Sequence, residues 1–302
     1  MCRIQSLAFI ISSGLINYAV ASDNQGWVNF ELKGGHVTIP SLINGIEGHS
    51  IIDTGASLIA VNKQAARHAG LSPSSKRQLV KGVTGTLNRR TYRDVPTNIF
   101  GADLNFEDVT EMTFGSESTQ LLLGGPLLRM FIFQFDYHNE RLRALPRNSV
   151  DLKKLSNIKS RRDNRNSRLP VVKVILGTKK SVWLTMDTGN SGGLLIRRKV
   201  AKNLGWLDEY ELTDHFVQGV NGTAAVQSFN VPVMHFGPFE MENVRVTVPA
   251  NGVHLPVVDE KGKLAEGLLG FDVLKHFVLT IDYKKGHVHV ALPETLQVSA
   301  GP

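Results

Sequence analysis

Alternation of apolar and polar residues along the chain predicts many short β-strands. Segments such as Val28–Leu32 and His36–Ile39 repeat with the two-residue period of a half-buried strand. Turn residues separate such segments, as in Leu42-Ile43-Asn44-Gly45, where Asn-Gly favours the tight turn of a β-hairpin. Frequent Gly and Pro, 28 and 12 residues, fit a chain with many turns. The pattern therefore predicts a β-rich protein.

Helical features are confined to short stretches. One helix is predicted from Lys63 to Ala69, with Asn62 as its cap and Gly70 ending it. A second is predicted from Arg197 to Leu204, again ended by a glycine. Each follows an apolar strand-like run that carries an aspartate, so the two helices occupy equivalent places in the two halves of the chain.

Two apolar runs end in the same polar sequence. The first is Ile51-Ile52-Asp53-Thr54-Gly55-Ala56-Ser57, and the second is Leu184-Thr185-Met186-Asp187-Thr188-Gly189-Asn190-Ser191. One Asp-Thr-Gly arises easily by chance, but two at the ends of similar strands indicate a shared role. Carboxylates held in contact cannot both ionise cheaply, so such a pair shares one proton and can act as general base and general acid.

The order of features repeats in the two halves: an Asp strand, a short helix, a glycine hairpin, a Leu-Leu-Gly run and a closing strand. The repeated pairs are Gly82–Thr86 with Gly219–Thr223, Leu122–Leu128 with Leu268–Leu274, and Phe131–Tyr137 with Phe277–Tyr283. Duplication explains this order. It predicts an all-β, bilobal fold with a few short helices, in which the two aspartates meet across a pseudo-two-fold axis.

Length and composition agree with two lobes. The 302 residues exceed the usual size of one domain, and 42% hydrophobic with 20% charged residues suffice for real cores. We predict an N-terminal lobe over residues 22–148, a linker over 149–168 and a C-terminal lobe over 169–302. An insertion from Pro249 to Lys263 is predicted to form a surface loop.

The first 21 residues are typical of a signal peptide. Arg3 precedes a mostly apolar run from Leu7 to Ile16, and Ala19-Val20-Ala21 is a small-x-small cleavage sequence. The run is too short for a stable membrane anchor. Cleavage there removes Cys2, the only cysteine, which excludes thiol catalysis, disulfides and cysteine-based metal sites. We therefore expect a periplasmic or secreted protein.

The net charge of +7 is concentrated in the linker. Residues 151–168 contain seven Lys or Arg and two Asp, and we expect a solvated, flexible segment. A nucleic-acid arm is disfavoured because no aromatic residues are interleaved. His287 and His289 alternate on one strand without an evident third ligand, so no metal is expected. Phosphate-binding loops and a Gly-x-Ser-x-Gly nucleophile elbow are absent.

These features together resemble the bacterial retropepsin-like aspartic proteases, with two retropepsin-type lobes fused in one chain. The resemblance covers roughly Phe30–Pro146 and Leu169–Leu292. It implies a substrate cleft between the lobes and hydrolysis of peptide bonds by activated water, without a cofactor. Because two intact lobes are present, we expect a monomer that forms an intramolecular pseudo-dimer. The alternative is a catalytically silent peptide-binding protein, although its usual mark, loss of one Asp, is missing.

The resemblance assigns roles to paired residues. Asp53 and Asp187 correspond to the catalytic pair. Supporting roles fall on the threonines that interlock the lobes, on glycines that allow close approach and offer amide donors, and on serines whose hydroxyls can join the network. These supporting residues are Thr54 and Thr188, Gly55 and Gly189, and Ser57 and Ser191.

The two glycine hairpins resemble flaps that close over bound peptide. The predicted flap residues are Gly82, Val83, Thr84 and Gly85 in the first lobe and Gly219, Val220, Asn221 and Gly222 in the second. Neither hairpin carries a Tyr, which favours the retropepsin comparison over pepsin. An ordinary surface turn is the alternative for the second hairpin.

The residue after each Asp-Thr-Gly suggests how the pair shares its proton. Ala56 has no hydroxyl to donate to Asp53, whereas the side-chain amide of Asn190 can donate to Asp187 and favour its ionised form. We therefore expect Asp53 to hold the proton more often, and activity to persist from mildly acidic to near-neutral pH.

Overall fold

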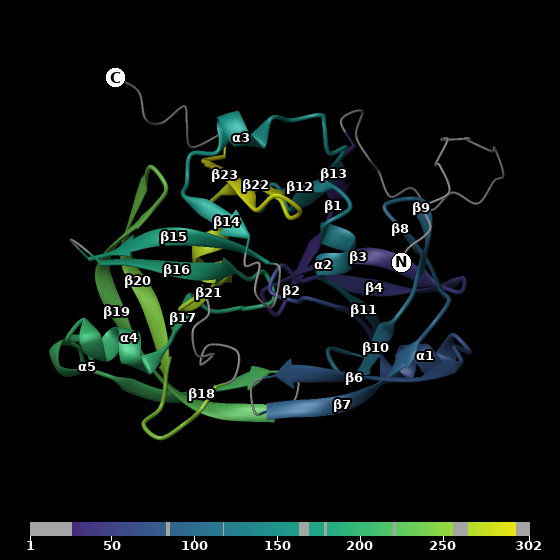
Figure 1. Ribbon diagram of the computed structural model, residues 1–302, viewed down its shortest axis with the longest axis horizontal. Coiled ribbons are helices and arrows are strands. Elements are labelled where there is room, and N and C mark those ends of the chain that lie inside the picture. Colours follow the sequence, from purple (N-terminus) through teal and green to yellow (C-terminus); the bar gives the residue numbers. More distant parts are fainter. Residues whose placement is uncertain are drawn as a thin grey trace.

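The computed structural model describes residues 26–82, 85–116, 118–162, 169–177, 180–219, 222–255 and 265–293. The predicted signal peptide, with Cys2, lies outside the described residues. Most of the described residues lie in strands, and the described helices are short. The fold is all-β and bilobal, as the sequence predicts (Figure 1).

The first lobe is built on one large sheet. Its strands, in spatial order, are β6 (Pro73–Gly82), β7 (Gly85–Tyr92), β10 (Val109–Met112), β5 (Ile59–Asn62), β11 (Thr119–Leu123), β4 (Ile46–Ile52), β3 (His36–Ile43), β8 (Val95–Ile99) and β9 (Ala102–Phe106), with β2 (Glu31–Lys33) paired to β3. The predicted turn between β3 and β4 has Asn44 at φ 51° and Gly45 at φ 80°. Two positive φ values are what a primed hairpin turn requires.

The second lobe repeats the first. Its strands, in spatial order, are β14 (Ser160–Arg162), β15 (Pro170–Leu176), β16 (Lys180–Met186), β21 (Gly267–Leu269), β17 (Leu194–Ile196), β20 (Phe239–Pro249), β19 (Gly222–Phe236) and β18 (Thr213–Gly219). The Asp-bearing strands β4 and β16 each run parallel to a Leu-Leu-Gly strand, β11 and β21 respectively. The duplication seen in the sequence is therefore a duplication of topology.

A third sheet joins the lobes. Its order is β1 (Val28–Asn29), β13 (Arg141–Leu145), β12 (Ile132–Asp136), β22 (Val278–Asp282) and β23 (His287–Ala291). The closing strands of the two halves, β12 and β22, pair antiparallel at its centre, with Phe133 opposite Ile281. Both residues are fully buried, in a core that continues through the two lobes. Burial of this seam holds the halves together.

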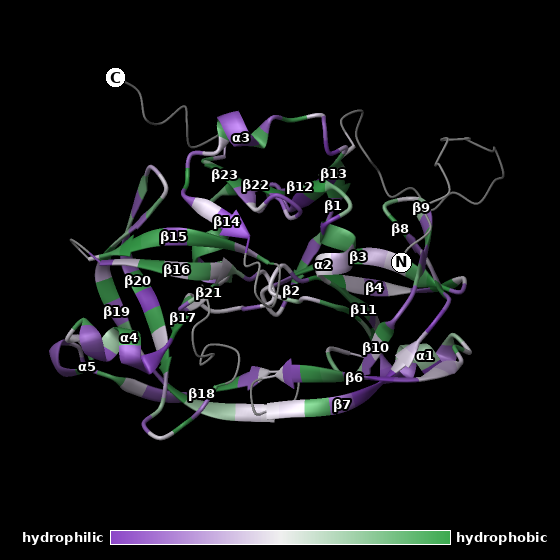
Figure 2. Ribbon diagram, viewed as in Figure 1, coloured by the Kyte–Doolittle hydropathy of each residue, from purple (hydrophilic) through white to green (hydrophobic). Residues whose placement is uncertain are grey.

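Two helices lie where the sequence predicts them. They are α1 (Lys63–His68) and α4 (Arg198–Asn203), and the others are α2 (Gly125–Leu128), α3 (Leu152–Leu155), α5 (Trp206–Glu209) and α6 (Phe271–Leu274). Asn62 caps α1, since its side chain accepts a hydrogen bond from the Gln64 amide at 3.2 Å. Figure 2 shows hydrophilic residues gathered on α4 and α5, whereas β15 is largely apolar.

The prediction of a flexible linker is wrong for its first part. Residues 152–162 contain α3 and β14, and β14 pairs antiparallel with β15 of the second lobe. Leu152 and Ile158 are 3% and 5% exposed, so apolar side chains anchor this segment despite its basic composition. Residues 163–168 lie outside the described part. The predicted insertion begins where β20 ends, at Pro249, and its residues 256–264 are likewise not described.

In the part of the chain that the structure describes, none of the helices combines the length and the apolar character needed to cross a bilayer.

Candidate active site

Each predicted catalytic aspartate follows directly after a strand. The Asp53 amide donates to the Leu123 carbonyl at 3.1 Å, and the Asp187 amide donates to the Leu269 carbonyl at 2.9 Å. The two Leu-Leu-Gly runs, conspicuous in the sequence as repeats, therefore hold the backbone at the two aspartates. The arrangement is the same in both lobes.

The two threonines bond across the lobes as the resemblance implies. The Thr54 hydroxyl accepts from the Thr188 amide at 2.8 Å and donates to the Met186 carbonyl at 2.9 Å. The Thr188 hydroxyl accepts from the Thr54 amide at 3.0 Å and donates to the Ile52 carbonyl at 2.7 Å. Both threonines are buried. This interlock fixes the two aspartate loops against each other.

The two glycines are required by the close approach of the loops. A Cβ on Gly55 would lie 2.3 Å from Cγ of Asp187, and a Cβ on Gly189 would lie 2.6 Å from Cγ of Asp53. No side chain fits there. Each glycine amide also donates to the aspartate of its own loop, Gly55 to Asp53 at 2.8 Å and Gly189 to Asp187 at 2.9 Å. Both predicted roles of the glycines are therefore met.

The close approach of the two loops brings the carboxyls of Asp53 and Asp187 together, and each influences the pKa of the other. Burial raises the pKa of both groups, because desolvation disfavours the charged form. The pKa of Asp187 lies well above its ordinary value, since the negative charge of Asp53 adds to burial. Asp187 is also the more buried, at 9% exposed, while Asp53 is half-buried. Both carboxyls are therefore harder to ionise than a free aspartate, which is the condition for a pair that shares one proton.

The interaction from which Asp53 was expected to hold the proton does not form, and the position of the proton stays a prediction. The Asn190 side chain does not donate to Asp187; its amide donates to the Gly193 carbonyl at 3.3 Å, and its oxygen accepts from the Gly192 amide at 3.1 Å. Asn190 thus caps the turn after Asp187. Its backbone amide lowers the pKa of Asp187, and the Ala56 backbone amide does the same for Asp53, so these contributions do not distinguish the two lobes.

Two tyrosines beneath the pair are missed by the sequence analysis. Tyr283 is fully buried and donates its hydroxyl to the Thr54 carbonyl at 2.5 Å. Tyr137, its counterpart at the end of the other closing strand, is 4% exposed, and its hydroxyl finds no partner among the described residues. Desolvation and the charge of Asp187 raise the pKa of both phenols, so they stay neutral. The Asp-Tyr sequence that ends both closing strands is the sequence feature that could have identified these two tyrosines.

The serines are less involved than the threonines. Ser57 and Ser191 are exposed, and within the described part neither hydroxyl bonds to a carboxylate. Their support of the network stays a prediction.

The predicted flaps are the hairpins β6–β7 and β18–β19. Gly82 pairs with Gly85, and Gly219 pairs with Gly222. The residues between them, Val83 and Thr84 in the first hairpin and Val220 and Asn221 in the second, lie outside the described residues. In Figure 1 the two hairpins extend toward each other along one edge of the molecule. Their action on a substrate stays a prediction.

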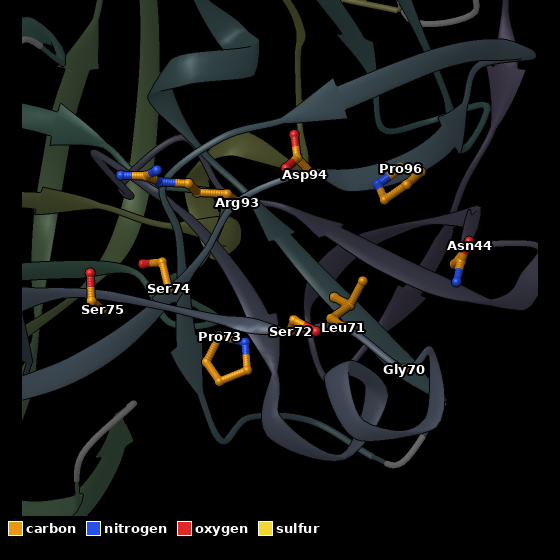
Figure 3. A pocket seen from close by; sticks show the side chains of 10 residues that line it. All are labelled: Asn44, Gly70, Leu71, Ser72, Pro73, Ser74, Ser75, Arg93, Asp94 and Pro96. Atoms are coloured by element: carbon orange, nitrogen blue, oxygen red, sulfur yellow. The ribbon is translucent and has the colours of Figure 1, made fainter.

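A cavity of about 430 Å³ lies elsewhere on the first lobe (Figure 3). It is lined by Asn44 of the β3–β4 turn, by Leu71 and its neighbours after α1, by the start of β6, by Arg93 and Asp94 between β7 and β8, and by Pro96 of β8. Neither aspartate borders it. This cavity is therefore not part of the candidate active site.

No cluster of three or more metal-ligating side chains occurs among the described residues. His287 and His289 lie on β23, and Nδ1 of His289 is 2.7 Å from the Leu155 carbonyl oxygen.

A duplicated β fold with two interlocked Asp-Thr-Gly loops is typical of the aspartic-protease class of proteins. The comparisons agree: residues 39–130 match the family model of the gag-polyprotein putative aspartyl proteases, and residues 172–273 match the aspartyl protease model. The chain therefore carries two retropepsin-like aspartyl protease domains. A search of curated proteins finds no match.

Proposed function

We propose that this protein is an aspartic endopeptidase that cleaves peptide bonds with water activated by Asp53 and Asp187. The observation that carries the proposal is the interlock of two Asp-Thr-Gly loops, which brings two buried carboxyls together and raises the pKa of both, so that the pair can hold a single proton. A pair in that state offers a base and an acid at one point. The two aspartyl protease domains support the same class of reaction.

In the proposed reaction one aspartate is ionised and the other protonated, and Asp187 is taken as the proton-bearing partner because its pKa is raised well above the ordinary value. Ionised Asp53 takes a proton from the water while the water oxygen bonds to the scissile carbonyl carbon. At the same time Asp187 gives its proton to the carbonyl oxygen. The product is a neutral tetrahedral diol. The C–N bond then breaks, the proton on Asp53 passes to the leaving nitrogen, and a diol hydroxyl returns its proton to Asp187. The pair ends with the one proton with which it began.

The substrate is a peptide or protein in our proposal, bound between the carboxyls and the two hairpins. Each hairpin rests on an apolar cluster of its own lobe: Val80 of β6 packs with Ala60 and Leu122, and Val217 of β18 packs against Leu195 and Ala224. These anchors fix the base of each hairpin near the aspartate loop. We further propose that the single chain is active without a cofactor, in the periplasm or outside the cell.

The test is hydrolysis of a mixed peptide library by the purified protein, with and without a pepstatin-like inhibitor. We expect cleavage that the inhibitor abolishes. The variants Asp53→Asn and Asp187→Asn serve as matched inactive controls. Binding of peptides without cleavage by the wild type would instead establish the silent peptide-binding alternative.

A further inference from the structure

Two large apolar side chains are exposed at equivalent positions of the two hairpins. Leu79 of β6 lies three residues before Gly82, and Phe216 of β18 lies three residues before Gly219. Their side chains are 70% and 73% exposed, more than any other large apolar residue in the described part of the chain. The same place in both lobes therefore presents an apolar side chain to solvent.

The faces that carry these two residues are turned away from the aspartates. Successive residues of a strand point to opposite faces of the sheet. The next residues, Val80 and Val217, pack in the apolar clusters of their own lobes, and the first cluster includes Ala56, which follows the first Asp-Thr-Gly. Leu79 and Phe216 therefore stand on the outer faces of the hairpins. Both hairpins lie along one edge of the molecule, and their outer faces belong to that edge (Figure 1).

The outer face of the first hairpin is also basic. Pairing of β6 with β7 places Arg77 opposite Arg90 and Leu79 opposite Asn88, and residues directly opposite each other share a face. Within the described part of the chain, neither Arg77 nor Arg90 forms an ion pair. The residues of this face are all exposed; they are Arg77, Leu79, Lys81, Thr86, Asn88 and Arg90. Three basic residues thus surround one apolar side chain.

The outer face of the second hairpin adds an apolar side chain with little charge. Pairing of β18 with β19 places Phe216 opposite Ala225. Asp214, two residues before Phe216, is the acidic residue of this face, and its carboxylate accepts a hydrogen bond from the Gln227 side chain at 2.9 Å. The two outer faces together therefore carry an excess of positive charge.

We propose that the outer faces of the two hairpins bind an anionic membrane surface. Leu79 and Phe216 enter the boundary between lipid headgroups and acyl chains, while Arg77, Lys81 and Arg90 contact lipid phosphates. Insertion of apolar side chains and attraction to anionic lipids are the two contributions that hold peripheral proteins on a membrane. Because a lipid layer is fluid, it accommodates two apolar side chains that stand on separate hairpins.

A protein partner fits these faces less well than lipid does. A stable interface between proteins needs about 800 Å² of closely fitted surface on each side, whether the partner is a second copy of this chain or another protein. The outer faces offer instead two separate apolar side chains among polar ones. An anionic lipid layer needs no fitted shape, and its charge complements the excess of basic residues.

The test measures binding of the purified protein to vesicles by cosedimentation. Vesicles of phosphatidylcholine alone are compared with vesicles that also contain phosphatidylglycerol. The protein should bind the phosphatidylglycerol vesicles more tightly, and added salt should weaken that binding, because salt screens exposed charges. Equal binding to both kinds of vesicle, or binding to neither, would overturn the proposal.

Serine variants test the apolar contribution. Leu79→Ser and Phe216→Ser should each weaken binding to phosphatidylglycerol vesicles about tenfold, because each removes an inserted side chain. Ile175→Ser is the matched control, since Ile175 is 40% exposed but lies on β15, away from the hairpins. Thermal unfolding establishes that each variant is folded. An equal loss of binding in Ile175→Ser would overturn the proposal.

Charge variants test the electrostatic contribution. Arg77→Gln/Arg90→Gln should weaken binding about 25-fold, or about fivefold for each charge lost near the lipid surface. Lys199→Gln/Lys202→Gln is the matched control: it changes the net charge equally, but at two exposed lysines of α4. The control should weaken binding much less. Equal effects of the two double variants would show that net charge alone attracts the protein, and would overturn the proposal.

Two further measurements separate insertion into lipid from contact with protein. The fluorescence of Phe216→Trp should shift to shorter wavelength when phosphatidylglycerol vesicles are added, relative to the same change in the wild type, and that of Ile175→Trp should not. Light scattering without lipid gives the oligomeric state. A wild-type dimer that Phe216→Ser converts to monomers would overturn the proposal in favour of a second copy of the chain.

Discussion

Replacing Thr54 with Val tests how strongly the interlock holds the lobes together. The hydroxyl makes two buried hydrogen bonds, from the Thr188 amide and to the Met186 carbonyl. Val keeps the shape of the side chain but leaves both backbone groups buried and unpaired. Each such group costs about 1–3 kcal/mol, so the free energy of unfolding should fall by about 2–6 kcal/mol. That is a large part of the roughly 5–15 kcal/mol typical of folded proteins.

Urea unfolding followed by circular dichroism measures this loss. Thr188→Val is the matched variant, because it removes the equivalent bonds with Thr54 and Ile52 and should cost about the same. Thr54→Ser retains the hydroxyl and should stay within about 1 kcal/mol of the wild type. The double Val variant should cost less than the sum of the two single ones, since both break one shared network.

The reasoning is refuted if Thr54→Val loses less than about 1 kcal/mol, the lower cost of a single unpaired buried group. It is also refuted if Thr54→Ser is as damaging as Thr54→Val, because the loss would then not come from the hydroxyl.

Three further outcomes are expected. Asp53→Asn and Asp187→Asn should abolish hydrolysis almost equally, because the pair acts as one unit; near-wild-type kcat in either variant would end the proposed mechanism. Folding raises the pKa of Asp187, so the stability that protonated Asp187 contributes is present below the unfolded-state pKa and is lost as the pH rises through the folded-state pKa. In thermal unfolding, Asp187→Asn should therefore lose less stability than the wild type as the pH rises. An equal decline in the wild type and the variant would contradict the raised pKa. Tyr283→Phe removes the hydroxyl that bonds to the Thr54 carbonyl and should lower the free energy of unfolding by about 1–3 kcal/mol. Tyr137→Phe removes a hydroxyl that has no partner among the described residues and should cost less; equal losses in urea unfolding would be inconsistent with the hydrogen bonding.

Much of the fold was predictable because its elements are encoded locally. The turn at Asn44-Gly45 and the helix capped by Asn62 depend on neighbouring residues only, and both form as predicted. The β14 strand was not predictable in this way. Its composition is basic, and it becomes a strand by pairing with β15 while Ile158 near it is buried.

For the candidate site, too, some features follow from the sequence and others only from the tertiary structure. The sequence by itself determined that Asp53 and Asp187 are the candidate pair, because duplication leaves the same motif at equivalent places in both halves of the chain. Only the tertiary structure decided that the two loops interlock and that burial raises the pKa of both carboxyls. The pKa of a buried group depends on hydration and charge that are summed over residues far apart in the chain, which a local sequence pattern does not reveal. Asn190 is an example. An asparagine at this position suggested a side-chain donor to Asp187, but in the structure its side chain caps the turn that follows.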